Sequence, residues 1–371
     1  MSDPVLAPLL QPFQCKSLNL RNRVAMAPMT RMFSPGYVPN EQVAGYYRRR
    51  AEGGVGLLIT EGTFVGHCAA NGYEKVPAIH GEAALAGWRK VVEEVHAAGA
   101  QIIPQLWHVG AVRREGIGPD PAVPGFSPSG LFKPGKPNGQ AMSRDDIDEV
   151  IAAFAQAARD AKAVGFDGVE IHGAHGYLID QFLWEGTNQR DDEYGGSLEK
   201  RARFAAEIVA AVRAAVGEDF AIVFRFSQWK QQDYEARLAH TPDELARLLQ
   251  PLTDAGVDIF HASTRRFWQP EFAGSPLNLA GWTRQLTGKP AITVGSVGLD
   301  EVFAGSTSQG MGATANPVGL ENLLERMAAD EFDLVAVGRA LLVDPQWLAK
   351  LLADRAAEIR PFTKAALESL S

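Results

Sequence analysis

Two histidines and a tyrosine stand close together in the segment IHGAHGYL, residues 171–178. His172 and His175 are three residues apart, and Tyr177 follows two residues later. Imidazole nitrogens bind metal ions or donate hydrogen bonds to a developing oxyanion, and a phenol can transfer a proton. The three side chains are therefore a candidate metal site, a candidate proton-transfer site or ordinary packing. The choice between these depends on the elements that hold them.

One pattern recurs along the chain and predicts those elements. An amphipathic, alanine-rich stretch ends in a glycine, and a short apolar run follows almost at once. Glycine just past a helix accepts the left-handed turn that ends it. The runs that follow are continuously apolar, as in parallel strands that are covered on both faces. The glycines at these junctions are Gly99, Gly165, Gly217, Gly256 and Gly288.

Three further apolar runs, at 22–29, 54–62 and 333–339, bring the count to about eight strand–helix units. No break in composition separates them. We therefore expect an α/β protein, a (β/α)8 TIM barrel in one domain over 1–371, with long loops above the carboxyl ends of its strands. A doubly wound open sheet is the alternative, but no G-x-G-x-x-G follows an early strand, which disfavours a dinucleotide-binding fold.

Composition and charge exclude several other classes. Of 371 residues, 46% are hydrophobic and 22% charged, and the net charge is −8, so no basic stripe favours nucleic acid or an anionic membrane. The two cysteines, Cys15 and Cys68, are too few for a disulfide framework or a cysteine zinc cluster and fit a reducing compartment. With no signal peptide and no apolar run of roughly 18 residues, we expect a cytoplasmic protein. Whether it forms a homo-oligomer stays open.

Some helix starts and long loops are also visible. Ser143 precedes an acidic helical stretch, and Thr241 precedes Pro242 and Glu244, which predicts a cap with a capping box.

Three loops, 110–142, 264–278 and 300–317, are long for a barrel. We expect them to shape access to a site, and the first could equally be a surface decoration.

Catalytic groups of barrel enzymes lie at the carboxyl ends of the strands. The groups at these ends include few carboxylates, which disfavours a hydrolytic metal site, so we expect no metal. Glycine-containing turns after the seventh and eighth strands match the usual phosphate site of barrels, and Arg339 adds a cation. A planar ligand that meets Thr30, Gln105 and Arg225 and carries a phosphate would fit, and flavin mononucleotide (FMN) is such a ligand.

Four segments carry a resemblance to a known family. They are MAPMTR (26–31), QLWHVG (105–110), IHGAHGYLIDQFLWEGTNQRDDEYGGSLEKRARF (171–204) and VAVGRALLVDP (335–345). The chain resembles the Old Yellow Enzyme family, the FMN-dependent NADH:flavin oxidoreductases and ene-reductases. The third segment is long and specific, and the others follow in the order of the family.

The resemblance implies a role for each matching residue. His172 and His175 would hydrogen-bond the carbonyl or nitro oxygen of a small-molecule substrate, and Tyr177 would protonate its α carbon. NADPH or NADH would be the reductant. The FMN-binding residues would be Pro28, Met29, Thr30, Gly62, Gln105, Arg225, Gly295, Ser296, Val297, Gly298, Gly338 and Arg339. Apart from the resemblance, aromatic residues are candidates to line the substrate pocket, with packing in the core, at the surface or beside the flavin as the alternative: Tyr73, Trp107, Trp229, Phe267, Trp268 and Phe362.

Three alternatives stay open. A flavin dehydrogenase working in the oxidative direction, like the amine dehydrogenases of this barrel, usually carries an iron–sulfur cluster, which two cysteines cannot ligate. A metal-dependent hydrolase or lyase predicts a colourless protein that chelators inhibit. A flavin-binding module without turnover predicts a yellow protein that no enone reoxidises.

Overall fold

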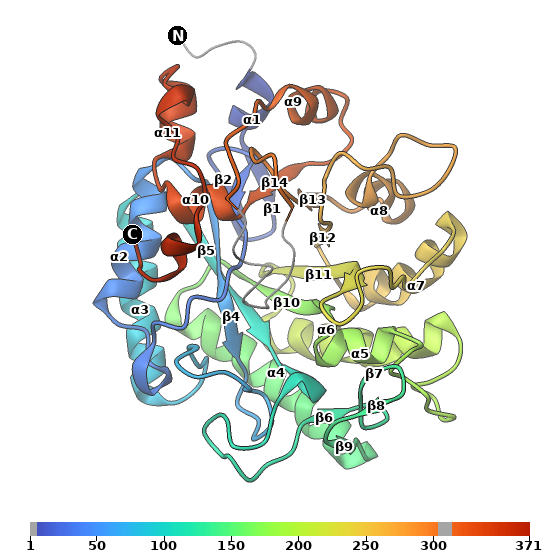
Figure 1. Cartoon of the computed structure of the whole chain (residues 1–371). Coiled ribbons are helices and arrows are strands. Elements are labelled where there is room, and N and C mark those ends of the chain that lie inside the picture. The colour runs from blue at the N-terminus through green and yellow to red at the C-terminus, as the bar shows by residue number, and fades with distance from the viewer. Residues whose placement is uncertain (1–5, 303–313) are drawn as a thin grey trace.

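Eight parallel strands close into a barrel in the computed structural model, which describes residues 6–302 and 314–371 (Figure 1). Their order around the barrel is β10-β11-β12-β13-β14-β3-β4-β5, so each strand pairs with its neighbours in the chain and the last closes on the first. This confirms the predicted (β/α)8 barrel. The strands are β3 (Val24–Met26), β4 (Leu57–Phe64), β5 (Gln101–Trp107), β10 (Gly168–His175), β11 (Ala221–Lys230), β12 (Ile259–Ser263), β13 (Ala291–Val294) and β14 (Leu334–Val337).

Helices surround the strands and bury their apolar faces against them (Figure 1). Each crossover from one parallel strand to the next runs through a helix on the outside, which covers the outer face of the barrel. The helices are α1 (Ala7–Leu10), α2 (Glu41–Glu52), α3 (Glu82–Ala97), α4 (Arg144–Val164), α5 (Leu178–Leu183), α6 (Leu198–Val216), α7 (Pro242–Ala255), α8 (Leu279–Thr287), α9 (Glu321–Ala328), α10 (Arg339–Val343) and α11 (Trp347–Leu352).

A separate apolar cluster fills the barrel interior. Ile103, Val223 and Ile259 belong to it, and none of these side chains is accessible to solvent. A hairpin of β1 (Phe13–Cys15) and β2 (Leu18–Leu20) adds Phe13, Leu18 and Leu20 to the same cluster. Because side chains alternate along a strand, residues two positions further on, such as Arg225 and His261, also point inward.

The predicted helix caps hold with one difference. The Ser143 hydroxyl accepts from Asp146 N, and the Asp146 carboxylate accepts from Ser143 N, which makes a full capping box. Thr241 caps α7 by accepting from Glu244 N. The Glu244 carboxylate, however, accepts from the backbone N–H of His240 instead of Thr241, so the box predicted there is not formed.

The first long loop, 110–142, contains two small sheets that its sequence did not predict. They pair β6 (Phe126–Ser127) with β9 (Gln140–Ala141) and β7 (Leu131–Lys133) with β8 (Lys136–Pro137). The glycine-rich loop 300–317 lies largely outside the described residues. Among the helices of the described part of the chain, none is long and apolar enough to cross a membrane.

Candidate active site

A cavity of about 360 Å³ opens at the carboxyl ends of the barrel strands. The chain brings residues from most of its length to this one place, since the cavity wall begins at Ala27 and includes Leu367. Its volume lies within the range typical of small-molecule sites. The lining includes most of the residues singled out from the sequence: Pro28, Met29, Thr30, Tyr73, Gln105, Trp107, His172, His175, Tyr177, Arg225, Gly295, Ser296, Val297, Gly338 and Arg339.

Three residues proposed for the site do not line this cavity. At Gly62, an added Cβ would lie 2.5 Å from Cε3 of Trp107, so this glycine makes room for the indole behind the cavity wall. Gly298 packs against Trp347 and adopts a φ of 69°. Trp268 packs edge-on against Phe267 with ring centroids 5.2 Å apart, and Phe267, too, is absent from the lining.

Several lining residues were missed from the sequence. Ser263 is the last residue of β12, and the strand-end rule applied to β12 places it at the cavity. Thr264 and Arg265 begin the loop 264–278, which was expected to shape access to a site. Gln231 and Leu367 also line the cavity. The first lies just beyond the end of β11 and the second close to the carboxyl terminus, and no local pattern marks either of them.

His172 and His175 lie at the end of β10, where the strand departs from regular pairing. The register with β11 shifts between Gly173 and His175, and His175 has a φ of 65°, which is uncommon outside glycine. The Ser227 hydroxyl accepts from His175 N at 3.0 Å and supports this backbone. Strain held in this way is typical of functional sites.

The two imidazoles are neutral in this environment. Burial, reinforced by the nearby charge of Arg225, holds the pKa of His172 well below its ordinary value, and the same causes act on the pKa of His175. His172 Nδ1 accepts from Ala174 N at 3.3 Å, so the ring proton is on Nε2, which is left to donate. His175 Nε2 lies 2.8 Å from the hydroxyl of Ser263.

Tyr177 is held as a protonated phenol. Its hydroxyl lies 3.1 Å from that of Tyr73 and accepts from Gln231 Nε2 at 3.2 Å. Burial is the main cause that raises the pKa of Tyr177 well above its usual value. Its ring packs edge-on against Trp107 and His172, with centroids 4.9 and 5.2 Å apart. A phenol and an imidazole donor thus face the same space.

Arg225 and Gln105 come from β11 and β5 and lie in the same wall of the cavity. Burial lowers the pKa of Arg225, and the charge of Glu170 raises it. Arg225 Nη2 donates to Ser263 at 3.3 Å, whereas its Nε has no hydrogen-bond partner among the described residues. A buried cation with an unused donor is suited to a ligand that carries or gains negative charge.

Residues after β13 and β14 line the opposite part of the cavity wall, since β14 is four strands from β10 around the barrel. Gly295 has a φ of 145°, and an added Cβ would lie 2.7 Å from the carbonyl oxygen of Thr264. Arg339 Nη2 lies 3.5 Å from the Ser296 hydroxyl, and burial lowers the pKa of Arg339. A glycine-lined turn beside an arginine is the arrangement that holds phosphate in such barrels.

A metal site is not present in the described residues, 6–302 and 314–371, where no group of three or more His, Cys, Asp or Glu side chains could hold an ion. The rings of His172 and His175 form one histidine pair, with centroids 5.3 Å apart. His108 and His67 also form a pair, with Nε2 and Nδ1 3.0 Å apart, but no carboxylate or thiol completes a site there.

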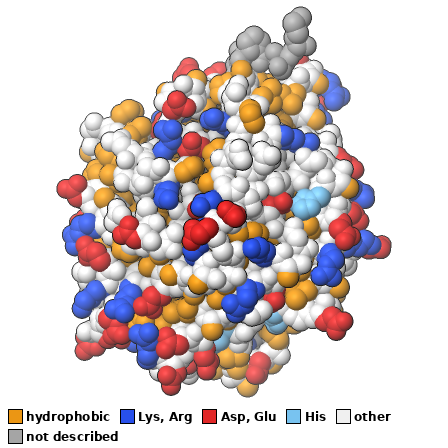
Figure 2. All heavy atoms as spheres, turned by 180° about the vertical axis from the view of Figure 1, so that it is seen from behind, with side chains coloured by type: hydrophobic (Ala, Val, Ile, Leu, Met, Phe, Trp, Pro, Cys, Tyr) orange, Lys and Arg blue, Asp and Glu red, His pale blue; other side chains and the backbone are white. Residues whose placement is uncertain are grey.

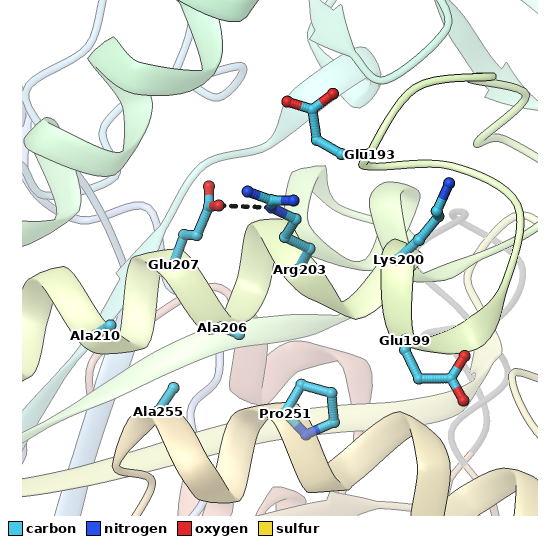
Figure 3. Close-up of a pocket in the computed structure, with 9 residues that line it drawn as sticks. All are labelled: Glu193, Glu199, Lys200, Arg203, Ala206, Glu207, Ala210, Pro251 and Ala255. Carbon is cyan, nitrogen blue, oxygen red and sulfur yellow. Dashed lines mark hydrogen bonds and ion pairs between the residues drawn. The ribbon is translucent and has the colours of Figure 1, made fainter.

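A second depression lies between α6 and α7 (Figure 3). Its volume is about 470 Å³, and its lining combines alanines with charged side chains, of which Arg203 and Glu207 form an ion pair with each other. It contains no imidazole, phenol or buried cation, so we place the chemistry at the barrel mouth. On the face seen in Figure 2, acidic and basic side chains are interspersed, without a single-sign stripe.

The fold and the site together are those of a barrel with a cavity at its strand ends that suits a phosphate-bearing planar ligand. The chain belongs to the NADH:flavin oxidoreductase / NADH oxidase family, whose model matches residues 8–314. Members of this family depend on FMN, with nicotinamide cofactors as partners. The resemblance to the Old Yellow Enzymes is thereby confirmed.

Relatives in rice and in a bacterium match different shares of the chain. 12-Oxophytodienoate reductase 7 of Oryza sativa subsp. japonica is 44% identical over 227 residues, which cover 57% of this chain and 57% of that enzyme. The NADH oxidase of Thermoanaerobacter brockii is 34% identical over 359 residues, covering 93% of this chain and 50% of the oxidase. The chain thus spans about half the length of these curated relatives.

Solved structures agree along almost the whole chain. Morphinone reductase in complex with tetrahydroNAD aligns with a TM-score of 0.80 and 30% identity, over 97% of this chain and 93% of that one. The Old Yellow Enzyme homologue of Zymomonas mobilis aligns with a TM-score of 0.79 and 25% identity, over 97% and 96% of the two chains.

Proposed function

We propose that this protein is an FMN-dependent ene-reductase that takes reducing equivalents from NADPH or NADH and reduces α,β-unsaturated carbonyl or nitro compounds. One observation carries the proposal. The neutral imidazole of His172, the protonated phenol of Tyr177 and the buried cation of Arg225 line one cavity. This reaction needs three groups: a hydrogen-bond donor for the carbonyl or nitro oxygen, a proton donor for the α carbon, and a positive charge that stabilises the reduced cofactor.

The residues present fit FMN. The unpartnered Nε of buried Arg225 offers a donor and a positive charge to the pyrimidine edge of the ring system, and Gln105 offers a polar partner in the same wall. Thr30, exposed to the cavity, would meet another ring oxygen. The phosphate would be held by Arg339 and by backbone N–H groups around Gly295, Ser296, Val297 and Gly338, which line the cavity.

FMN, held by these residues, would supply a hydride for the β carbon of the substrate. The side chains of this chain do the rest. His172, through Nε2–H, and His175 donate hydrogen bonds to the carbonyl or nitro oxygen and stabilise the negative charge that gathers there. Tyr177 gives its proton to the α carbon. The Tyr73 hydroxyl, 3.1 Å away, is placed to donate a hydrogen bond to the phenolate oxygen that remains.

The relatives support the substrate class. Two proteins similar to this chain are named reductases, of 12-oxophytodienoate and of morphinone, and the second forms a complex with a nicotinamide analogue. We propose small-molecule enones or nitro compounds as substrates, and residues 1–371 as a single FMN-binding domain. The free cysteines, Cys15 and Cys68, support a reducing location such as the cytoplasm. A homo-oligomer is compatible with the proposal.

The experiment has two stages. Purified protein should show the visible absorption of an oxidised flavin and should release FMN, not FAD, when denatured. Anaerobic mixing with NADPH or NADH should bleach that absorption, and an enone should restore it in a second mixing. A colourless protein, or a bleached protein that oxygen reoxidises while a panel of enones and nitroalkenes does not, would contradict an ene-reductase.

A further inference from the structure

Three polar side chains meet where the cavity adjoins the apolar interior of the barrel. Gln105 comes from β5, Glu170 from β10 and His261 from β12. Glu170 and Gln105 are register partners on adjacent strands, and Arg225 of β11 is the register partner of His261. Glu170 and His261 are fully buried, and Gln105 is exposed only toward the cavity that it lines. A buried carboxylate in this position needs compensating partners.

The first partner of Glu170 is the amide of Gln105. The amide nitrogen Nε2 of Gln105 donates to Glu170 Oε1 at 2.7 Å. An ionised carboxylate only accepts hydrogen bonds, so the amide must turn its NH₂ group toward Glu170. The carbonyl oxygen of Gln105 is then left for the cavity. The polarity that the glutamine presents to a ligand therefore depends on Glu170, which itself does not line the cavity.

The second partner fixes the carboxylate itself. Glu170 Oε2 lies 2.6 Å from Nδ1 of His261. Burial is the main cause that lowers the pKa of His261, so the ring is neutral and its single proton on Nδ1 donates to Glu170. Both carboxylate oxygens are thus occupied, one by Gln105 and one by His261. The group cannot rotate without losing a buried hydrogen bond.

Glu170 also acts on Arg225 through its charge. It is the group whose negative charge raises the pKa of Arg225 against the effect of burial. The cavity is therefore lined by the buried cation of Arg225, and the compensating negative charge of Glu170 lies behind it in the barrel. Removing that counter-charge makes the surroundings of the cavity more positive.

We propose that Glu170 is a positioning residue for the cofactor: it orients Gln105 so that its carbonyl oxygen faces FMN, and it offsets the charge of Arg225. This inference rests on the proposed function, because it requires FMN to contact Gln105 and Arg225. His261 serves the same end by anchoring the second carboxylate oxygen.

The test uses the affinity of the apoprotein for FMN and the reduction potential of the bound cofactor. Glu170→Gln replaces an acceptor-only group by one that can also donate, so Gln105 loses its fixed orientation. We expect FMN binding to weaken tenfold or more. The potential of the bound flavin should become more positive, because the loss of a negative charge beside Arg225 favours the more negative, reduced cofactor.

A double-mutant cycle separates a positioning role from a merely structural one. Glu170→Gln should have little further effect on FMN affinity in a protein that already carries Gln105→Ala. Glu271→Gln is the matched control, because this half-buried carboxylate pairs with Arg237 away from the cavity, and it should leave both readouts unchanged. Additive losses in the cycle, or an unchanged potential in Glu170→Gln, would overturn the positioning role.

A measurement on the unaltered protein covers the case in which Glu170→Gln does not fold. A carbonyl oxygen held toward the cavity accepts from the ring N–H of FMN, so an N3-methylated FMN should bind the wild-type apoprotein at least tenfold more weakly than FMN does. Equal affinities would contradict the fixed orientation. If Gln105→Ala itself leaves FMN affinity unchanged, the placement of FMN in the proposed function is wrong; if only Glu170→Gln is silent, that placement stands without the inference.

Discussion

The hydroxyl oxygens of Tyr73 and Tyr177 lie 3.1 Å apart, although 104 positions separate the two residues in the sequence. The ring of Tyr73 stacks on Trp107, with centroids 5.2 Å apart, and the ring of Tyr177 meets the same indole edge-on. Trp107 therefore fixes both phenols. Tyr73 can therefore donate a hydrogen bond that stabilises the negative charge on Tyr177 once its proton has left.

Tyr177→Phe should separate the two half-reactions. Reduction of the bound flavin by NADPH or NADH should keep its rate, because no proton from Tyr177 is needed there. Reoxidation by an enone should slow by a factor of roughly 10² or more, the usual contribution of a positioned acid. Stopped-flow absorbance measures both rates. Tyr73→Phe is the control and should slow reoxidation less; an equal loss in both half-reactions would count against the proton-donor role.

His172 and His175 should control the binding of phenols, which mimic the substrate oxygen. Replacing both by alanine should abolish the long-wavelength absorption that a phenolate gives when it stacks on an oxidised flavin. Because burial and Arg225 keep the pKa of both histidines well below the ordinary value, their neutral state should persist across neutral pH. The pH dependence of binding should therefore follow the phenol's own pKa. An extra ionisation near pH 6 to 7, absent from the double variant, would show that a histidine is charged.

How far the sequence predicts this site depends on the kind of residue. The rule that barrel chemistry lies at strand ends places Gln105, His172 and Arg225 in the cavity, because each side chain points inward from a strand whose apolar run is plain in the sequence. The same rule applied to β12 would have placed Ser263. Gln231 and Leu367 follow no such rule, since a loop and a terminal segment reach the cavity through tertiary packing.

The two glycines that do not line the cavity, Gly62 and Gly298, have a common physical reason. The strand-end rule predicts the position of a residue along the barrel axis. It does not predict which large side chain packs against that residue. Trp107 occupies the position next to Gly62, and Trp347 occupies the position next to Gly298. Bulky side chains from elsewhere in the chain thus cover glycines that the sequence alone leaves accessible.

Glu61 should give the stability of the protein a distinct pH dependence. It is fully buried, and burial raises its pKa from 4.5 to about 7, even though its carboxylate accepts from Arg31 N and Met32 N. A folded-state pKa above the unfolded value means that the folded protein holds the proton more tightly. Stability should therefore fall as pH rises from about 4.5 to about 7, by roughly 3 kcal/mol from this group, and then level off.

Glu61→Gln tests this because its side-chain oxygen can still accept from Arg31 N and Met32 N while the ionisation is lost. Urea unfolding of both proteins between pH 4.5 and 8 gives the difference in free energy of unfolding at each pH. That difference isolates Glu61 from other titrating groups, such as Asp180. We expect the variant to gain relative stability with rising pH, up to about pH 7. Parallel curves would mean that folding does not raise the pKa of Glu61.

A buried ion pair lies behind the loop that carries His175 and Tyr177. Lys230 Nζ lies 2.7 Å from Asp180 Oδ1, and neither side chain is exposed to solvent. The other carboxylate oxygen accepts from Gly176 N at 2.7 Å, between His175 and Tyr177. Burial raises the pKa of Asp180 to about 6, although Lys230 opposes the rise. The pair thus ties the end of β11 to the loop that carries the candidate proton donor.

Removing one partner of this pair leaves the other charge buried and unpaired. Lys230→Met and Asp180→Asn should each destabilise the fold by roughly 3–5 kcal/mol, whereas the double variant should lose less than the sum of the two. Because Asp180 also holds Gly176, Asp180→Asn should slow enone reduction more than it slows flavin reduction by NADPH, while Lys230→Met should leave the Gly176 contact in place. Urea unfolding and the two half-reaction rates measure these effects. Additive destabilisation in the double variant would show that the two charges do not depend on each other.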